Sequence, residues 1–215
     1  NTMEMNVAGD ISLISGKDLV VGVNVKSINA GGSVVLESKQ GNVGVENSSV
    51  TSKGDLIVVA QQDATAENTK LESLNGSLSV VAKYGQVNVD ELAAADMVAA
   101  GSGNGDVVIG SVDGKSVVLY TEGQGKKITA DSIKVEQALV LQGDNITALN
   151  VDRSANNGQL LVDLTGSAGG AMKGKLDLEV DGDVRFTTTS VTDATITIDG
   201  TASFDKLHSE GKLEI

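Results

Sequence analysis

The 215-residue chain contains no proline, no cysteine and no tryptophan, and its only aromatic residues are Tyr84, Tyr120, Phe186 and Phe204. A globular core of this size ordinarily uses more large rings, so their scarcity argues against a conventional globular core. Proline would remove a backbone donor from a sheet whose strands are paired on both sides, and its absence fits such a sheet. Without cysteine, the sequence carries no information on the redox state of its compartment.

Positive charge is also scarce, with 16 Lys and Arg against 29 Asp and Glu and a formal net charge of −13. An acidic chain repels phosphate backbones and anionic bilayers, so we expect no nucleic-acid partner and no membrane-surface partner. No stretch approaches the roughly 18 to 20 apolar residues of a membrane helix, so we expect no membrane insertion. The chain begins with Asn1 and has no charged-then-apolar leader, which we interpret as a processed or internal piece of a longer protein.

The chain is rich in a repeating motif: a glycine, a small polar residue and then alternating aliphatics. The motif starts at Gly9, Gly32, Gly54, Gly76 and Gly105, in steps of 23, 22, 22 and 29 residues. A period of this size is typical of a solenoid, in which each unit buries its apolar face only by stacking on its neighbour. The connectors are too short for crossover helices, so each coil must pair in parallel with the next.

These features predict an all-β fold, a parallel β-helix (β-solenoid) of about 22 residues per coil and roughly ten coils, with residues 1–215 as a single segment. At about 4.8 Å per coil, the rod would be about 45–50 Å long. Inward Val and Leu residues would form ladders, and we place Val35, Val58 and Val80 among the positions where a change to Asp disrupts the stack. Beyond residue 126 the period loosens, and residues 166–171 (GSAGGA) are interpreted as a turn or small loop.

The block from residue 76 to 104 is longer than the others. Residues 91–100 (ELAAADMVAA) are the only run of good helix formers, and a glycine-rich corner follows them at 101–105. We therefore predict a surface excursion from the coil, or a short helix, over residues 91–105. The alternative is an ordinary coil segment in which Leu92 and Ala94 face inward.

The repeats resemble those of filamentous-haemagglutinin-type exoproteins, large bacterial surface and secreted adhesins of the two-partner secretion pathway. The resemblance lies in residues 32–38 (GSVVLES), 41–47 (GNVGVEN) and 54–60 (GDLIVVA), and covers about residues 9–126, more loosely the rest. It implies a right-handed parallel β-helix, export across the outer membrane, and adhesive or stalk duty. The family's N-terminal secretion domain carries Asn-Pro signatures, so this proline-free chain resembles an internal or distal fragment.

Three motifs suggest a catalytic, phosphate-binding or calcium-binding site, but each departs from the pattern that such a site requires. The single histidine, His208, lies near the C-terminus, whereas a serine-type triad or a metal site needs further partners. Residues 110–116 (GSVDGKS) are one residue short of a phosphate loop and lead into a strand, so we interpret them as a turn. Residues 101–106 (GSGNGD) resemble a calcium-binding nonapeptide, but the Asp falls one place late and the motif does not repeat.

Other polar motifs also have simpler explanations. Asp181 and Asp183 could serve polysaccharide hydrolysis. Binding of an acidic sugar would also require basic residues, and arginine occurs only at Arg153 and Arg185. The simpler interpretation of residues 181–183 is a turn between two strands. The threonines at 187–189, 195 and 197 suggest an ice-binding array, although threonine is simply a good strand residue. Glycosylation patterns start at Asn47, Asn75 and Asn145, about as many as chance gives.

We therefore expect a rigid, acidic rod segment of a secreted or surface-exposed bacterial adhesin that mediates or supports attachment to cells, matrix or biofilm. Its partners would be a host-cell or matrix receptor or a surface polysaccharide, and an outer-membrane transporter during secretion. We assign no catalytic, cofactor-binding or metal residue and expect no enzyme. The alternatives are a polysaccharide-processing β-helix enzyme, which a groove with three or more converging carboxylates and a base would favour, and a receptor-binding stalk of a contact-dependent toxin-delivery exoprotein.

Overall fold

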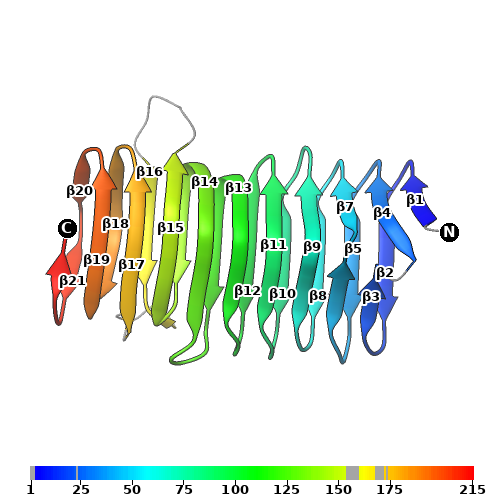
Figure 1. The fold of residues 1–215 in the computed structure, drawn as a ribbon, viewed down its shortest axis with the longest axis horizontal. Coiled ribbons are helices and arrows are strands. Elements are labelled where there is room, and N and C mark those ends of the chain that lie inside the picture. The colour runs from blue at the N-terminus through cyan, green and yellow to red at the C-terminus, as the bar shows by residue number, and fades with distance from the viewer. Residues whose placement is uncertain (1–2, 23, 154–159, 168–171, 173) are drawn as a thin grey trace.

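The computed structural model describes residues 3–22, 24–153, 160–167, 172 and 174–215. Across the residues that the structure describes, the fold has no helices and 70% strand, and its parallel strands form a β-solenoid of about 9 turns with about 21 residues per turn (Figure 1). The predicted β-solenoid is confirmed, with slightly fewer and slightly shorter turns than expected. The two termini lie at opposite ends of the rod (Figure 1). The turn predicted at 166–171 lies largely outside the described residues.

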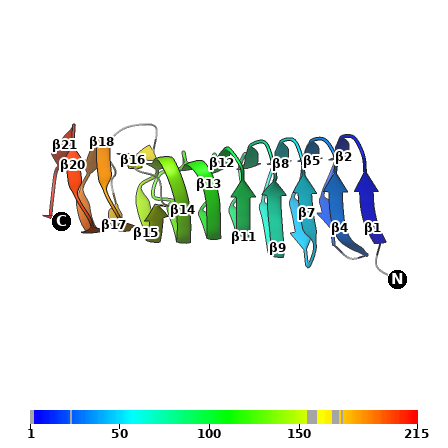
Figure 2. The same ribbon diagram turned by 90° about the horizontal axis from the view of Figure 1, so that it is seen from above.

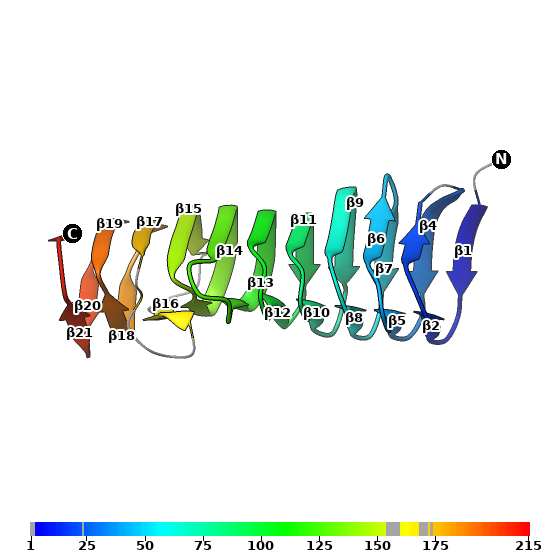
Figure 3. The ribbon, with the colours of Figure 1, turned by 90° about the horizontal axis from the view of Figure 1, so that it is seen from below.

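Each turn of the chain crosses three faces, defined by which strands pair along the rod. Face 1 contains β2 (Ile11–Ser15), β5 (Val34–Ser38), β8 (Leu56–Ala60), β10 (Leu78–Ala82), β12 (Met97–Ser102), the last parts of β13 (Val107–Thr121) and β14 (Lys127–Gln142), β16 (Leu160–Thr165), β18 (Val184–Val191), β20 (Ala202–Phe204) and β21 (Leu207–Ser209). Figures 2 and 3 show the strands of successive turns side by side along the rod.

The other two faces share several long strands. Face 2 contains β3 (Leu19–Val21), β6 (Val43–Glu46), the first parts of β9 (Ala64–Ser73), β11 (Val87–Ala94), β13, β14, β15 (Asn145–Arg153), β17 (Lys175–Asp181) and β19 (Asp193–Asp199), and β22 (Leu213–Glu214). Face 3 contains β1 (Met3–Val7), β4 (Val25–Ala30), β7 (Ser49–Ser52), the end segments of β9, β11, β15, β17 and β19, and the middle segments of β13 and β14.

The core consists of aliphatic ladders. On face 1, two columns of inward side chains run from turn to turn, each at most 3% exposed: Val34, Leu56, Leu78, Val98, Val117 and Leu139 in one, and Leu36, Val58, Val80, Ala100, Leu119 and Leu141 in the other. Strand side chains alternate in direction, so a residue's immediate neighbours in the chain point to solvent. Rings enter the ladder only near the C-terminus, where Phe186 stacks on Phe204 with centroids 4.7 Å apart.

One inward placement made from the sequence is wrong. Val58 and Val80 lie in the core, but Val35 points outward from face 1 and is only half-buried. Val34 and Leu36 take the inward positions on either side of it. The run of consecutive aliphatic residues in β5 hides this alternation, because apolar side chains stand on both sides of the strand.

Residues 91–105 form the end of β11, β12 and the two corners at 95–96 and 103–105, rather than the predicted excursion or helix. Leu92, at the end of β11, is fully buried and pairs with Leu71, and β12 pairs with β10 residue by residue. The wrong prediction came from treating Gly105 as equivalent to Gly76, which precedes a face 1 strand. Gly105 instead precedes a face 2 strand and lies in register with Gly85. The 29-residue block is therefore one turn plus the first strand of the next, and the coil-segment alternative is correct.

Aspartates at the corners, several of them directly after a motif glycine, have a structural role. A side-chain oxygen of each accepts a hydrogen bond from a backbone N–H in the following turn. The pairs include Asp10 with Ser33, Asp18 with Asn42, Asp55 with Ser77, Asp63 with Gln86 and Asp106 with Lys127, at 2.7–2.9 Å. These bonds satisfy N–H groups that the corner would otherwise leave without a strand partner.

We expect Asp63→Ala to lower the free energy of unfolding by about 1–2 kcal/mol, because the Gln86 N–H loses an acceptor 2.8 Å away. Asp63→Asn keeps an acceptor oxygen and is the matched control, with a much smaller effect. Urea unfolding followed by circular dichroism measures both. Equal losses in the two variants would show that the charge, and not the hydrogen bond, matters at this corner.

Buried hydroxyls close two of the corners, with Ser73 where face 3 ends and Ser102 and Thr121 where face 1 ends. Ser73 Oγ donates to the carbonyl of Gly54 at 2.8 Å, and Thr121 Oγ1 donates to that of Gly105 at 2.8 Å. Ser102 Oγ accepts from the Gly105 N–H at 2.6 Å. All three side chains are almost fully buried, and buried polar groups are stable only when they are hydrogen-bonded.

Candidate functional site

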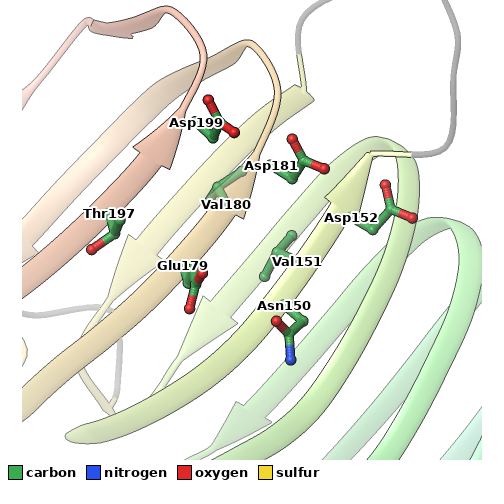
Figure 4. A pocket seen from close by; sticks show the side chains of 8 residues that line it. All are labelled: Asn150, Val151, Asp152, Glu179, Val180, Asp181, Thr197 and Asp199. Carbon is green, nitrogen blue, oxygen red and sulfur yellow. The ribbon is translucent and has the colours of Figure 1, made fainter.

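Three aspartates form a row along face 3, which we call the acidic ladder: Asp152, Asp181 and Asp199. They occupy the ends of β15, β17 and β19, and strand register places Asp181 beside both of the others. In Figure 4 the three carboxylates stand in one line and point away from the strands. Neighbouring parallel strands lie about 4.8 Å apart, so the ladder concentrates three like charges on adjacent turns.

The acidic ladder borders a shallow hollow of about 370 Å³. A fourth carboxylate, Glu179, and the polar side chains of Asn150 and Thr197 also line it (Figure 4). All of these polar side chains are exposed, while Val151 and Val180 beneath them point into the core. The hollow is therefore acidic, open to water and floored by the aliphatic ladder.

The same outward column carries a different charge pattern earlier in the rod. There Lys134 Nζ lies 3.4 Å from Asp113 Oδ2 on the adjacent turn, so opposite charges alternate. No ion pair to the acidic ladder occurs within the described part of the chain. Like charges on directly opposite residues destabilise a sheet, and opposite charges stabilise it. The acidic ladder therefore lowers the stability of its turns, whereas the Asp113–Lys134 pair adds stability to the preceding ones.

The acidic ladder presents exposed carboxylates that are spaced by the distance between neighbouring strands. Such groups accept hydrogen bonds from sugar hydroxyls and attract cations. A general acid requires a carboxyl whose surroundings favour protonation, usually through burial, and the exposed ladder lacks that burial. Across the described ranges, no cluster of three or more His, Cys, Asp or Glu side chains is arranged to hold a metal ion.

A second hollow of about 430 Å³ lies on face 2 of the same turns. It carries Lys175 and Lys212 together with Asp177, Asp193 and Glu214, and Lys212 pairs with Glu214 at 2.6 Å. Basic groups thus lie on these turns, on the neighbouring face to the acidic ladder.

His208 and the phosphate-loop-like segment are brought to no common site. His208 lies exposed in β21, and its Nε2 is 3.7 Å from Glu210 Oε1. Residues 110–116 lie inside β13 and pair with β14 through Ser111 and Asp113. The turn predicted there is wrong, because the long strand passes from face 2 through face 3 to face 1 with only a register shift after Gly114.

The remaining sequence motifs are corner elements. Gly182, at a φ of 101°, makes the turn between β17 and β18, as predicted for residues 181–183. In the calcium-like segment, Asp106 Oδ1 accepts the Lys127 N–H at 2.9 Å. Arg185 donates to both carboxylate oxygens of Asp205 on the next turn, from Nε to Oδ1 and from Nη2 to Oδ2.

The threonines and the glycosylation-pattern asparagines are scattered. Thr187 and Thr188 lie on face 1, whereas Thr195 lies on face 2, so they share no flat array. Asn145 makes hydrogen bonds at a corner, donating to the Gly125 carbonyl at 3.1 Å. The other two asparagines, Asn47 and Asn75, are exposed.

Asp163 is a carboxylate whose environment is clearly perturbed. It stands outward on face 1 beside Val140, and burial raises its pKa above the ordinary value of 3.8. In the described chain its Oδ1 is buried and has no hydrogen-bond partner. Ionisation of Asp163 therefore costs more in the folded chain than in the unfolded chain.

Because the folded chain holds this proton more tightly, the cost is present at neutral pH and disappears as the pH falls toward 4. We expect Asp163→Asn to raise the Tm by a few degrees at pH 7 and to have little effect near pH 4. Thermal melts at several pH values measure the difference, with the exposed Asp177→Asn as the matched control. A gain for Asp163→Asn that persists unchanged at pH 4 would contradict this origin.

The acidic ladder was missed from the sequence, although a signal exists. Each aspartate follows an inward aliphatic residue, in the order Asn150-Val151-Asp152, Glu179-Val180-Asp181 and Thr197-Ile198-Asp199. Unequal turn lengths separate the three, so no fixed period aligns them. Only strand pairing shows that they are neighbours.

Among the described residues, no helix is both long and apolar enough to span a membrane. No protein-family model, no curated protein and no solved structure matches the chain. Support for the fold therefore comes from the structure of this chain itself: parallel turns stacked over an aliphatic core, with a row of exposed aspartates on adjacent turns of face 3.

Proposed function

We propose that this chain is a rigid rod segment of a secreted or surface-exposed bacterial adhesin, which mediates or supports attachment to cells, matrix or biofilm. The observation that carries the proposal is continuous parallel pairing from the first described strand to the last over one aliphatic core. Such pairing gives an elongated scaffold in which every turn braces the next. The sequence resemblance to filamentous-haemagglutinin-type repeats supports the same role.

The rod presents its outward side chains as potential contact surfaces. We propose a host-cell or matrix receptor, or a surface polysaccharide, as the partner, and an outer-membrane transporter as the partner during export. The exposed carboxylates and hydroxyls of face 3 suit hydroxyl-rich ligands, because each can take part in hydrogen bonds with sugar hydroxyls.

Attachment is tested with beads coated with the folded chain and applied to epithelial monolayers, to fibronectin and collagen coats, and to a glycan array. The coated control is the core variant Val80→Asp, which should not fold. Binding by the folded chain above this control supports an adhesive segment. Small-angle X-ray scattering tests the spacer role: a rod about 40–45 Å long supports it, and a compact particle contradicts it.

A second candidate function rests on the acidic ladder and its hollow. Carboxylates from adjacent turns are the groups that polysaccharide-processing enzymes use as acid, base or nucleophile. Release of reducing ends from a panel of neutral and acidic polysaccharides tests this function. Loss of activity in Asp181→Asn, but not in Asp113→Asn from the same outward column, would support an enzyme; no release from any polysaccharide would count against it.

A further inference from the structure

The outward side of face 1 is aliphatic. Its two outward columns contain Val35, Ile57, Ala99, Val118 and Val140 in one, and Val59, Val81 and Tyr120 in the other. We call these eight residues the aliphatic stripe. It continues across six successive strands, from β5 to β14, and is interrupted by Ser79 and Gly101 within it and by Glu37 on β5 and Gln142 on β14 at its two ends. No described strand packs over it, because face 1 pairs only along the rod.

The outward side of face 3 shows that this pattern is not general. There the corresponding columns contain Lys70, Glu72, Glu91, Asp113 and Lys134, several of them joined in ion pairs. Scattered apolar residues on a surface need no explanation, but a contiguous apolar stripe on one face of the rod marks a contact surface.

In the first turns of the stripe, the two margins carry opposite charges. Asp10 and Asp55 lie just before β2 and β8 on the upstream margin, and Lys39 and Lys83 lie just after β5 and β10 on the downstream margin. All four residues are exposed, and within the described chain none takes part in an ion pair. Lys53 also lies on the upstream side, but further from the stripe, at the corner with face 3. On the later turns this pattern ends, because Lys115 pairs with Asp96 on the upstream margin and the exposed Glu122 lies on the downstream margin.

We propose that the aliphatic stripe is covered by a second copy of this chain, packed face 1 to face 1 about a two-fold axis parallel to the rod. This symmetry brings the upstream margin of one copy against the downstream margin of the other at the same height. Asp55 belongs to the turn between those of Lys39 and Lys83, so it would lie between these two lysines of the second copy. The self-complementary charges select a second copy over a partner of uniform charge.

The size of the stripe sets the strength of the contact. Strands of five residues are about 17 Å wide, and six strands span about 25–30 Å along the rod, so two copies together bury about 1,000 Å². This area is at the lower end for specific interfaces, so the dimer should be weak and reversible. The proposal does not depend on the attachment function, because self-association is measured without any ligand.

Sedimentation equilibrium of the whole chain, from micromolar to millimolar concentration, is the direct test. We expect a monomer–dimer equilibrium that Val81→Lys weakens at least tenfold. Thr65→Lys, at a half-buried outward position of face 2, is the matched control and should leave the equilibrium unchanged. Circular dichroism establishes that both variants fold. A monomer at all concentrations would overturn the proposal, and so would a dimer unaffected by Val81→Lys.

A charge test separates this arrangement from unspecific apolar contact. Asp55→Asn keeps the corner acceptor for the Ser77 N–H and should weaken the dimer of the unmodified chain. In a Lys39→Glu/Lys83→Glu background, the same Asp55→Asn change should strengthen the dimer, because it removes a repulsion. An effect of the same sign in both backgrounds would overturn the two-fold arrangement. Binding of a purely monomeric chain to anionic lipid vesicles, blocked by Val81→Lys, would assign the stripe to a lipid surface instead.

Discussion

Replacing Val80 by aspartate should abolish the cooperative folding of the rod, whereas the same replacement one residue later should not. Val80 is 1% exposed and lies in the inward column between Val58 and Ala100. A carboxylate there loses the burial of the valine and has no polar partner, at a total cost of about 4–5 kcal/mol or more. That cost is comparable with the whole stability of many domains.

Val81 is the matched control, because it has the same side chain on the same strand but points outward. We expect Val81→Asp to keep the circular dichroism spectrum of the folded chain and to lower the Tm by only a few degrees, measured at a concentration where the chain is monomeric. Equal damage from the two variants would show that side-chain direction in β10 is not as described.

Adding a single methyl group at Gly105 should be the second large effect. A Cβ at this position would meet the Gly85 carbonyl and would lie 2.6 Å from the Gln86 nitrogen, all of them backbone atoms of the preceding turn. Backbone cannot move aside without separating two turns. We therefore expect Gly105→Ala to cost about 3 kcal/mol, which lowers the Tm by roughly 6–12 °C in a chain of this length.

Gly9→Ala provides the control, because Gly9 opens the same kind of motif in the first turn. No atom lies within 4 Å of a Cβ built at Gly9, since no described turn lies beneath it. Thermal unfolding should show a large loss for Gly105→Ala and almost none for Gly9→Ala. Similar losses in both would mean that glycine is required for backbone freedom and not for the close approach of successive turns.

The solenoid could be predicted from the sequence because its turns in the first half are nearly equal in length. Gly32, Gly54 and Gly76 open the same corner of face 1 on successive turns, so their spacing gives the period directly. The scarcity of rings also reflects the structure, since most core positions lie in a narrow space between faces and hold Val, Leu, Ile or Ala.

The details that could not be predicted depend on which corner a glycine occupies. Gly105 and Gly76 share the same local motif but open different faces, and nothing in either motif distinguishes the two corners. The sequence also does not show which side chains of β5 point into the core. Val34 and Val35 are the same residue type, and only strand pairing and burial show that Val34 is the inward one. The acidic ladder needed pairing too, because its turns differ in length.

The corner hydrogen bonds have a consequence for how the rod forms. In most of them, the oxygen belongs to the earlier turn and the N–H to the later one, as between Asp55 and Ser77 or Asp63 and Gln86. A finished turn therefore offers the incoming chain fixed acceptors as well as a strand edge, whereas a later turn offers its predecessor few of them. We therefore expect folding to proceed turn by turn more readily toward the C-terminus than toward the N-terminus.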